Sequence, residues 1–191
     1  MSSELKTNKV SPATGTALQI GDSGDTITIP SGATIANSGS ATGFGHDSTP
    51  AWHVYRSATQ TIADDTNTKV EYNLETIDTD SAYDNSTNYR FTVPSGEGGN
   101  YFVYATGNMY GTDLSEINLQ IKLNGSNIRT MQNSLSGSIF AQQGIQAMGI
   151  IPLSAADYLE VFAQGQVSGG NVTFYSSGTS VSYFGGFKLG F

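Results

Sequence analysis

The sequence predicts an all-β protein in which two antiparallel sheets form a sandwich, preceded by a long N-terminal leader. Short runs rich in aromatic and β-branched residues alternate between apolar and polar positions, as half-buried strands do. Clusters of Gly, Pro, Asn and Asp separate these runs at intervals of about 8–12 residues, a spacing typical of sandwiches and jelly rolls. No segment keeps a helical period over more than one turn. The 191 residues suffice for one such domain and an appendage.

Residues 1–45 differ from the rest of the chain and form the leader. Apolar side chains alternate there only over short stretches, at Leu18 and Ile20, Ile27 and Ile29, and Ala33 and Ile35. Turn sequences around Gly21 and Pro30 separate these stretches, which predicts very short strands. Such strands bury too little apolar surface to be stable alone, but they become stable when identical chains wind together as a stalk. The alternative is a leader without regular structure; in either case residues 46–50 are expected to be a hinge.

Residues 51–191 contain the strand signals in regular order. We expect about ten strands, at residues 51–56, 68–73, 89–93, 101–108, 114–123, 128–131, 138–153, 158–164, 172–175 and 181–189. The pair Asn124-Gly125 predicts a two-residue hairpin turn with positive φ. In the run 101–105 alternate residues point to opposite faces, and both faces are largely apolar. Such a strand belongs in the middle of a sandwich or at a subunit interface.

Charge and composition exclude several classes of function. Sixteen acidic and eight basic side chains give a net charge of −8, and the basic ones are scattered, which argues against nucleic-acid binding. No run of about 18 apolar residues is present, so no membrane insertion is expected. The chain has no cysteine, and its first ten residues lack the apolar core of a secretion signal. Assembly into a virion that is released by lysis is one route by which such a protein reaches the outside of a cell.

One acidic loop is a candidate metal site. Asp78, Asp80 and Asp84 lie in the loop 76–86, and oxygen ligands at such a spacing can bind calcium. The loop lacks the glycine and the terminal glutamate of an EF-hand, so solvated acids in a turn are the simpler interpretation. We therefore expect no cofactor and keep calcium as the alternative.

The sequence does not indicate an enzyme. Gly21-Asp22-Ser23-Gly24 has the letters of a serine-protease nucleophile, but the leader has no core to orient a base, and turns prefer the same residues. The two histidines, His46 and His53, have no acidic partner in register and are interpreted as surface or packing residues. Cleavage of a polysaccharide would need paired carboxylates across a groove, and no expected strand places two on one face.

Six short motifs follow one another in the second part of the chain. They are Ala51-Trp52-His53-Val54, Val70-Glu71-Tyr72-Asn73, residues 89–103, Leu123-Asn124-Gly125, residues 156–161 and residues 181–189. In this order they resemble the globular heads of complement proteins and the tumour-necrosis-factor (TNF)-like jelly rolls, with Ala156 where that family has glycine. The resemblance implies a ten-stranded jelly roll that forms a tight homotrimer. It also implies an interface near the threefold axis, with members from Phe102, Tyr104, Tyr183, Phe184 and Phe187, and some relatives carry calcium near the top of the trimer.

The leader carries a second resemblance. Residues 18–45, LQIGDSGDTITIPSGATIANSGSATGFG, are similar to the leaders of structural proteins of tailed phages. Together the two resemblances imply a non-enzymatic component of a bacteriophage virion, a trimeric fibre or spike. Residues 1–45 would dock to other virion proteins, and the head at 51–191 would contact a carbohydrate or protein of the host surface. A capsid-surface fibre or decoration protein is the first alternative, and a secreted carbohydrate- or protein-binding module is the second.

Overall fold

The computed structural model describes residues 10–36, 38, 50–135, 140–178 and 181–190. The chain divides into two compact units, Met1–Phe44 and Gly45–Phe191. Every regular element in the described part of the chain is a β-strand. This part therefore has no helix that is long and apolar enough to cross a membrane.

The described part of the first unit, residues 10–36 and 38, contains turns but no strand. The backbone N–H of Asp25 donates to the carbonyl of Asp22, and that of Ala33 donates to the carbonyl of Pro30, each at 3.0 Å. Both predicted turns are therefore present, whereas the short strands predicted beside them are not formed. The apolar side chains stay exposed, Ile20 to 66%. A strand needs a partner for its backbone, and the described leader offers none, so the pairing of leaders in a stalk stays a prediction.

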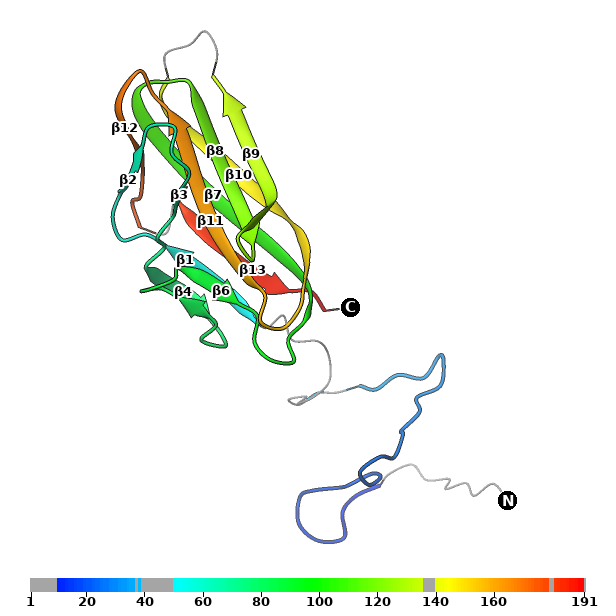
Figure 1. Cartoon of the computed structure of the whole chain (residues 1–191). Coiled ribbons are helices and arrows are strands. Elements are labelled where there is room, and N and C mark those ends of the chain that lie inside the picture. The colour runs from blue at the N-terminus through cyan, green and yellow to red at the C-terminus, as the bar shows by residue number, and fades with distance from the viewer. Residues whose placement is uncertain (1–9, 37, 39–49, 136–139, 179–180, 191) are drawn as a thin grey trace. The chain divides into compact units, whose positions relative to one another are not determined.

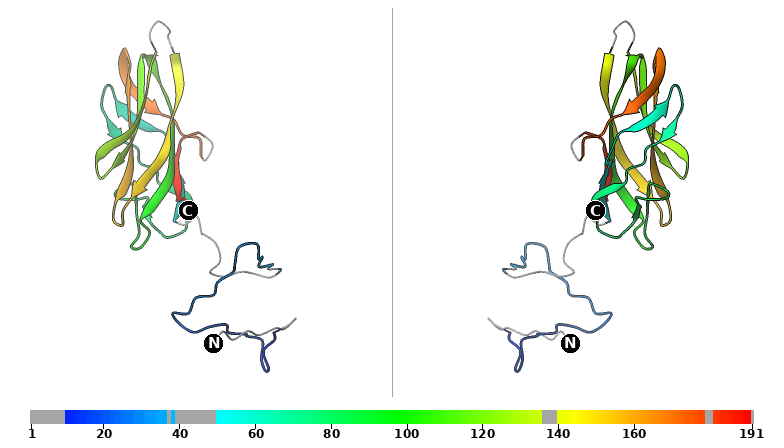
Figure 2. Two further views of the ribbon diagram at one scale, coloured as in Figure 1. Left: turned by 90° about the vertical axis from the view of Figure 1, so that its right-hand side faces the viewer. Right: turned by 90° about the vertical axis from the view of Figure 1, so that its left-hand side faces the viewer.

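The second unit is a sandwich of two antiparallel sheets, which confirms the predicted fold class (Figure 1). Its strands are β1 Ala51–Tyr55, β2 Gln60–Ala63, β3 Thr68–Lys69, β4 Leu74–Asp78, β5 Tyr83–Asp84, β6 Arg90–Thr92, β7 Gly99–Leu114, β8 Glu116–Leu123, β9 Ser126–Ser134, β10 Phe140–Leu153, β11 Tyr158–Gln166, β12 Gly169–Phe174 and β13 Tyr183–Lys188. Sheet A has the order β2-β12-β7-β13-β1-β4, with β10 also paired to β7. Sheet B has the order β5-β6-β11-β8-β9, with β3 paired to β11. Figure 2 shows the sandwich from two further sides.

The strands follow the predicted order, with differences mainly between residues 60 and 84. The predicted strand at 68–73 pairs only at its start, as β3, and Val70 and Tyr72 are buried in the core outside any strand. The structure adds β2, β4 and β5. Of these, β2 and β5 have four and two residues and are too short to show an alternation, and β4 lies largely exposed at the edge of sheet A. It also extends the predicted strand at 101–108 to Leu114, because β7 pairs along its whole length with β10.

β7 organises sheet A. It pairs along one edge with β10, and along the other edge first with β13 and then with β12. Its alternate residues point to opposite faces. Tyr101, Val103 and Ala105 are fully buried between the sheets, whereas Phe102 and Tyr104 point away from sheet B and remain partly exposed.

The core is built around Trp52 of β1. Its ring stacks on Phe91 of sheet B, with a centroid distance of 3.7 Å and an interplanar angle of 7°. The ring of Phe184 meets it edge-on at 5.6 Å. The neighbouring strand β13 makes room for the indole through Gly186, where an added Cβ would lie 2.5 Å from Trp52 Cη2. This glycine has no unusual φ, so it is required for space and not for backbone conformation.

We therefore expect Gly186→Ala to lower the free energy of unfolding by about 1–3 kcal/mol, because the added methyl group must displace the indole or the β7 backbone. Urea denaturation followed by tryptophan fluorescence measures this change, since Trp52 is the single tryptophan of the chain. Gly144→Ala in β10 is the control, because nothing lies closer than 4.0 Å to its added Cβ. Equal stabilities of the two variants would contradict the requirement for space at Gly186.

Candidate functional site

Sheet A presents an aromatic face on the side away from sheet B. The strand register places its side chains in three rows across β1, β13, β7 and β10. The rows are Ala51–Phe187–Phe102–Ile150, His53–Gly185–Tyr104–Met148 and Tyr55–Tyr183–Thr106–Gln146. Ile77 of β4 continues the second row beyond His53. We call these residues the aromatic face; none of them is Asp, Glu, Lys or Arg.

The rings of the aromatic face contact one another. The ring of Phe102 lies 5.7 Å from that of Phe187 and 6.0 Å from that of Tyr104. The ring of Tyr104 in turn meets that of Tyr183 edge-on at 6.0 Å. Tilted and edge-on arrangements at such distances are favourable for aromatic pairs. The four rings therefore form one cluster over β7 and β13.

His53 is joined to this cluster by a hydrogen bond. Its Nδ1 lies 2.9 Å from Tyr104 Oη, and its ring centroid lies 5.1 Å from that of Tyr183. His53 and Tyr104 stand on strands that are separated by β13, and the residue between them in the row is Gly185. An added Cβ at Gly185 would lie 2.5 Å from Tyr104 Oη. Only a glycine at this position lets the two side chains meet across the strand.

The two outer faces of the sandwich differ in charge. On the aromatic face, large apolar side chains remain exposed, Ile77 to 48%, Met148 to 51% and Ile150 to 53%. The opposite face, on sheet B, carries charged side chains. There Lys122 Nζ lies 3.7 Å above the ring of Phe162, and Lys69 pairs with Glu160. Charged groups mark a surface that stays in water, whereas an exposed apolar patch marks a contact surface.

Burial shifts the ionisation of two groups on the aromatic face. It raises the pKa of Tyr104, and the nearby Tyr183 adds to the rise. It lowers the pKa of His53 below the usual 6.5, because an imidazolium loses hydration when it is partly covered. Both shifts favour the neutral form, so the face is uncharged at neutral pH.

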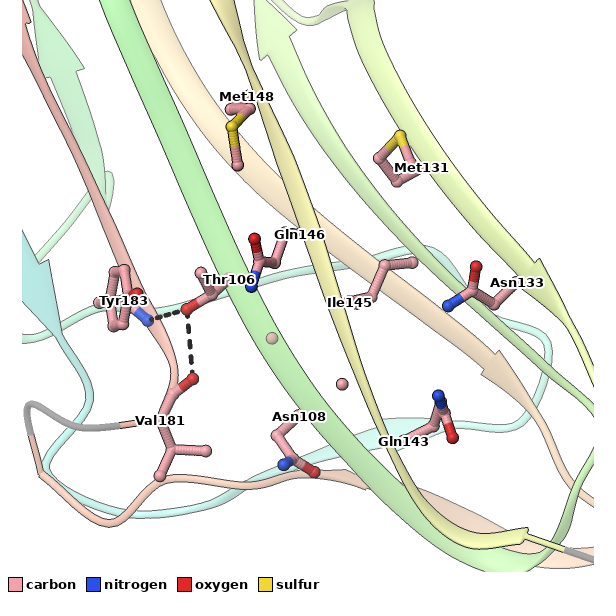
Figure 3. Close-up of a pocket in the computed structure, with 12 residues that line it drawn as sticks. Thr106, Asn108, Met131, Asn133, Gln143, Ile145, Gln146, Met148, Val181 and Tyr183 are labelled. Atoms are coloured by element: carbon pink, nitrogen blue, oxygen red, sulfur yellow. Dashed lines mark hydrogen bonds between the residues drawn. The ribbon is translucent and has the colours of Figure 1, made fainter.

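Beyond the third row the aromatic face continues into a shallow depression with a volume of about 810 Å³ (Figure 3). Thr106 is fixed there, since its Oγ1 donates to the carbonyl of Val181 and accepts from the N–H of Tyr183, each at 3.2 Å. The amides of Asn108, Asn133, Gln143 and Gln146 also line it, and its lining has no charged side chain. The depression therefore suits an uncharged polar surface or ligand better than an ion.

The structure places the residues of the predicted interface in two different environments. Phe102, Tyr104, Tyr183 and Phe187 lie together on the aromatic face. Phe184 does not: it is completely buried between the sheets, against Trp52 and Tyr72. Its inclusion in the interface is corrected, because β13 alternates and neighbouring residues cannot share a face. Sequence analysis missed His53 and Gly185, because their roles appear only once the register of three strands is known.

The three candidate calcium ligands lie in turns of the head. The described residues contain no group of three or more His, Asp or Glu that could hold a metal ion. The carboxylate of Asp78 accepts hydrogen bonds from the N–H groups of Ala82 and Tyr83, each at 3.0 Å. Asp84 accepts bonds from the next turn, and Asp80 accepts one from the Thr79 hydroxyl. Asp78 and Asp84 each stabilise a turn, whereas Asp80 binds only a neighbouring side chain, and in the described structure the three acids do not converge on a common centre.

No protein-family model and no curated protein matches this sequence. Solved structures do match the second unit. A TNF named Eiger from S. frugiperda superimposes with a TM-score of 0.56 at 15% identity, over 73% of this chain and 91% of that one. Murine APRIL superimposes with a TM-score of 0.55 at 12% identity, over 73% of this chain and 98% of that one. The globular domain of zebrafish complement 1qA superimposes with a TM-score of 0.50 at 17% identity, over 73% of this chain and 97% of that one.

The second unit has the TNF-like jelly-roll fold. The resemblance noted in the sequence is confirmed at the level of the fold, because the match includes 91–98% of the length of each of these structures. Identities of 12–17% show the fold alone. In this TNF-like head the aromatic face is the outer face of sheet A on which apolar side chains remain exposed.

Asp84 provides a test of the interpretation that these acids stabilise turns. Its carboxylate accepts bonds from the N–H groups of Thr87, Ser86 and Asn88, and these bonds lower the pKa of Asp84 far below its usual value. We expect Asp84→Asn to lower the free energy of unfolding by about 1 kcal/mol at pH 7, as loss of a turn or cap acceptor does. Because the folded pKa is depressed, this contribution is present above the unfolded pKa of about 3.9 and is lost as the pH falls further.

Urea denaturation at pH 7 and at pH 3 measures the difference. The gap between the wild type and Asp84→Asn should narrow at pH 3, whereas Asp80→Asn, which removes a single side-chain bond, should change little at either pH. A melting temperature that rises with calcium and falls with a chelator would contradict the turn role and would indicate that these acids bind the metal.

Proposed function

We propose that this protein is a non-enzymatic structural component of a bacteriophage virion, a homotrimeric fibre or spike with an N-terminal docking leader and a TNF-like head that contacts the host surface. The observation that carries the proposal is the aromatic face. It is uncharged, its rings form one cluster, and nothing in the described part of the same chain covers it. An apolar surface of this kind is buried when the working molecule has several copies of the chain.

The magnitudes support assembly. Burial contributes about 25 cal/mol per Å² of apolar surface, and the rings of Phe102, Tyr104, Tyr183 and Phe187 still expose up to about a third of their area. With the more exposed Ile77, Met148 and Ile150, the face of one subunit contributes on the order of 10 kcal/mol. Association costs roughly 4–15 kcal/mol, so the face as a whole is needed and no single ring suffices. The resemblance to TNF-like heads supports three copies.

The two ends of the sandwich differ, and this difference supports an assignment of the end that contacts the host. The described part of the second unit begins at Pro50, whose carbonyl accepts a hydrogen bond of 3.1 Å from the N–H of Lys188 in the last strand. The start of β1 and the end of β13 therefore lie at the end of the sandwich that joins the leader. The opposite end carries the turns β2–β3, β7–β8 and β11–β12, where Asp65 Oδ1 accepts bonds from Gln164 and Gln166. We assign contact with a host carbohydrate or protein to this opposite end.

A binding module outside any virion is the second candidate. The structures that superimpose on the head are a TNF from S. frugiperda, murine APRIL and a globular domain of zebrafish complement 1qA, and none of them is named as a virion protein. A tail fibre and a capsid-surface fibre share every feature described above. Imaging of labelled protein on whole particles separates these three possibilities.

The aromatic face is tested by Phe102→Ser with Tyr104→Ser. We expect the double variant to be monomeric or aggregated at micromolar concentration, because it removes the centre of the ring cluster. Sedimentation velocity measures the state. Tyr158→Ser with Phe162→Ser is the matched control, since these two rings lie on the charged face beneath Arg90 and Lys122. A wild-type chain that sediments as a stable folded monomer would refute the homotrimer.

The leader is tested by deletion of residues 1–45. The truncated head should still fold and trimerise, because the aromatic face and the core lie in the second unit. It should fail to join virions, because the docking leader is gone. Immunogold labelling of particles assembled with the full or the truncated protein measures incorporation. Normal incorporation of the truncated protein would show that the leader is not the docking segment.

A further inference from the structure

One side chain of the aromatic face is a histidine, His53. Histidine is the residue whose ordinary pKa lies near neutral pH. His53 stands in the second row, with its Nδ1 bonded to Tyr104 Oη and its ring against that of Tyr183. The chain has one other histidine, His46, which precedes the described part of the head.

No charged side chain of the described residues faces His53 from the strands around it. From β7 and β13 it meets Tyr104 and Tyr183, and beside it on β4 stands Ile77. The acids of β4 lie at inward positions, since Glu75 pairs with Val54 and Asp78 with Trp52. On β1 itself, the outward neighbours of His53 are Ala51 and Tyr55. The titratable groups on this side are therefore tyrosines, and none of them is a carboxylate or a cation.

We propose that His53 makes assembly through the aromatic face dependent on pH, so that the homotrimer is favoured at and above pH 7 and weakens as the pH falls below about 6.5. This inference rests on the homotrimer proposed above and names its regulation. Protonation places one positive charge per subunit in a surface that has no carboxylate to balance it.

The direction follows from linkage. A histidine that is more deeply buried in the trimer than in the free subunit holds its proton more weakly there. Burial already lowers the pKa of His53 within the single subunit. The free subunit consequently binds more protons than the trimer at acid pH, and association weakens as the pH falls. If each His53 binds its proton tenfold more weakly in the trimer, three copies weaken association by up to about a thousandfold below both pKa values.

The neighbouring hydroxyl and ring do not compensate for this charge. When protonated, the imidazolium carries an N–H on both ring nitrogens: Nδ1 then donates to Tyr104 Oη, and the second N–H needs an acceptor as well. The ring of Tyr183 offers a cation–π contact at 5.1 Å, which recovers less than burial of an unpaired charge costs. The neutral imidazole, by contrast, fits the face without any unpaired charge.

The test is sedimentation of the full chain at pH 8 and at pH 5 over a range of concentrations. The wild type and the control His46→Gln should be trimeric at pH 8 and should dissociate at pH 5 at concentrations up to about thirtyfold higher than at pH 8. The dissociation constant of a trimer scales with the square of the concentration, so a thousandfold change in the constant moves the midpoint concentration by its square root. His53→Gln, which is polar but cannot titrate, should give the same trimer at both pH values. Acid dissociation that persists unchanged in His53→Gln would overturn the inference. A wild-type trimer that dissociates at the same concentration at pH 5 and at pH 8 would overturn it as well.

A second measurement does not depend on assembly of the variant. The chain has only two histidines, so their imidazole proton resonances can be followed by NMR and assigned with His46→Gln. In the wild-type trimer the His53 resonance should titrate at a lower pH than that of His46, and an equal or higher pKa would overturn the inference. A wild-type chain that is monomeric at pH 8 would instead refute the homotrimer itself, so the two failures are distinguishable.

Discussion

Two consecutive glycines in β13 are the constraint on which both faces of sheet A depend. Gly186 points inward and leaves the space that the indole of Trp52 occupies, and Gly185 points outward and leaves the space for Tyr104 Oη. A side chain at either position would collide with a large ring on its own face. One strand without side chains at two successive positions therefore lets aromatic residues from β1 and β7 pack over it, in the core on one side and on the open surface on the other.

This arrangement makes the two outer faces of the sandwich unequal. Over β13 the rings from neighbouring strands close into a continuous apolar cluster, and no position in its rows carries a charge. Sheet B instead keeps its aromatic side chains beneath cations, with Arg90 over Tyr158 and Lys122 over Phe162. An aromatic ring covered by a solvated cation is shielded from further contacts, whereas a bare cluster is not. The difference in charge, more than the number of aromatic residues, distinguishes the outer face of sheet A from that of sheet B.

Much of the fold could be predicted from alternation alone, but the site could not. The pattern in β7 places Phe102 and Tyr104 opposite Tyr101 and Val103, and this needs only the period of two. Assigning Phe184 to the core needs the phase of β13, which two adjacent glycines and flanking aromatics leave undetermined in the sequence. The row from His53 through Gly185 to Tyr104 needs the register of three strands far apart along the chain. Register depends on long-range pairing, which a single sequence does not display.

The composition of the aromatic face also explains how one surface tolerates both water and burial. A face of leucines would aggregate before it met its partner, whereas Tyr104 and Tyr183 present rings with a hydroxyl that water can reach. Burial then requires that these polar atoms find partners. The bond between Tyr104 Oη and His53 Nδ1 supplies one such partner within the subunit, so that these two atoms keep their mutual hydrogen bond when water leaves. The same bond places the histidine of the described face beside the ring cluster, and the proposed effect of pH on assembly rests on that position.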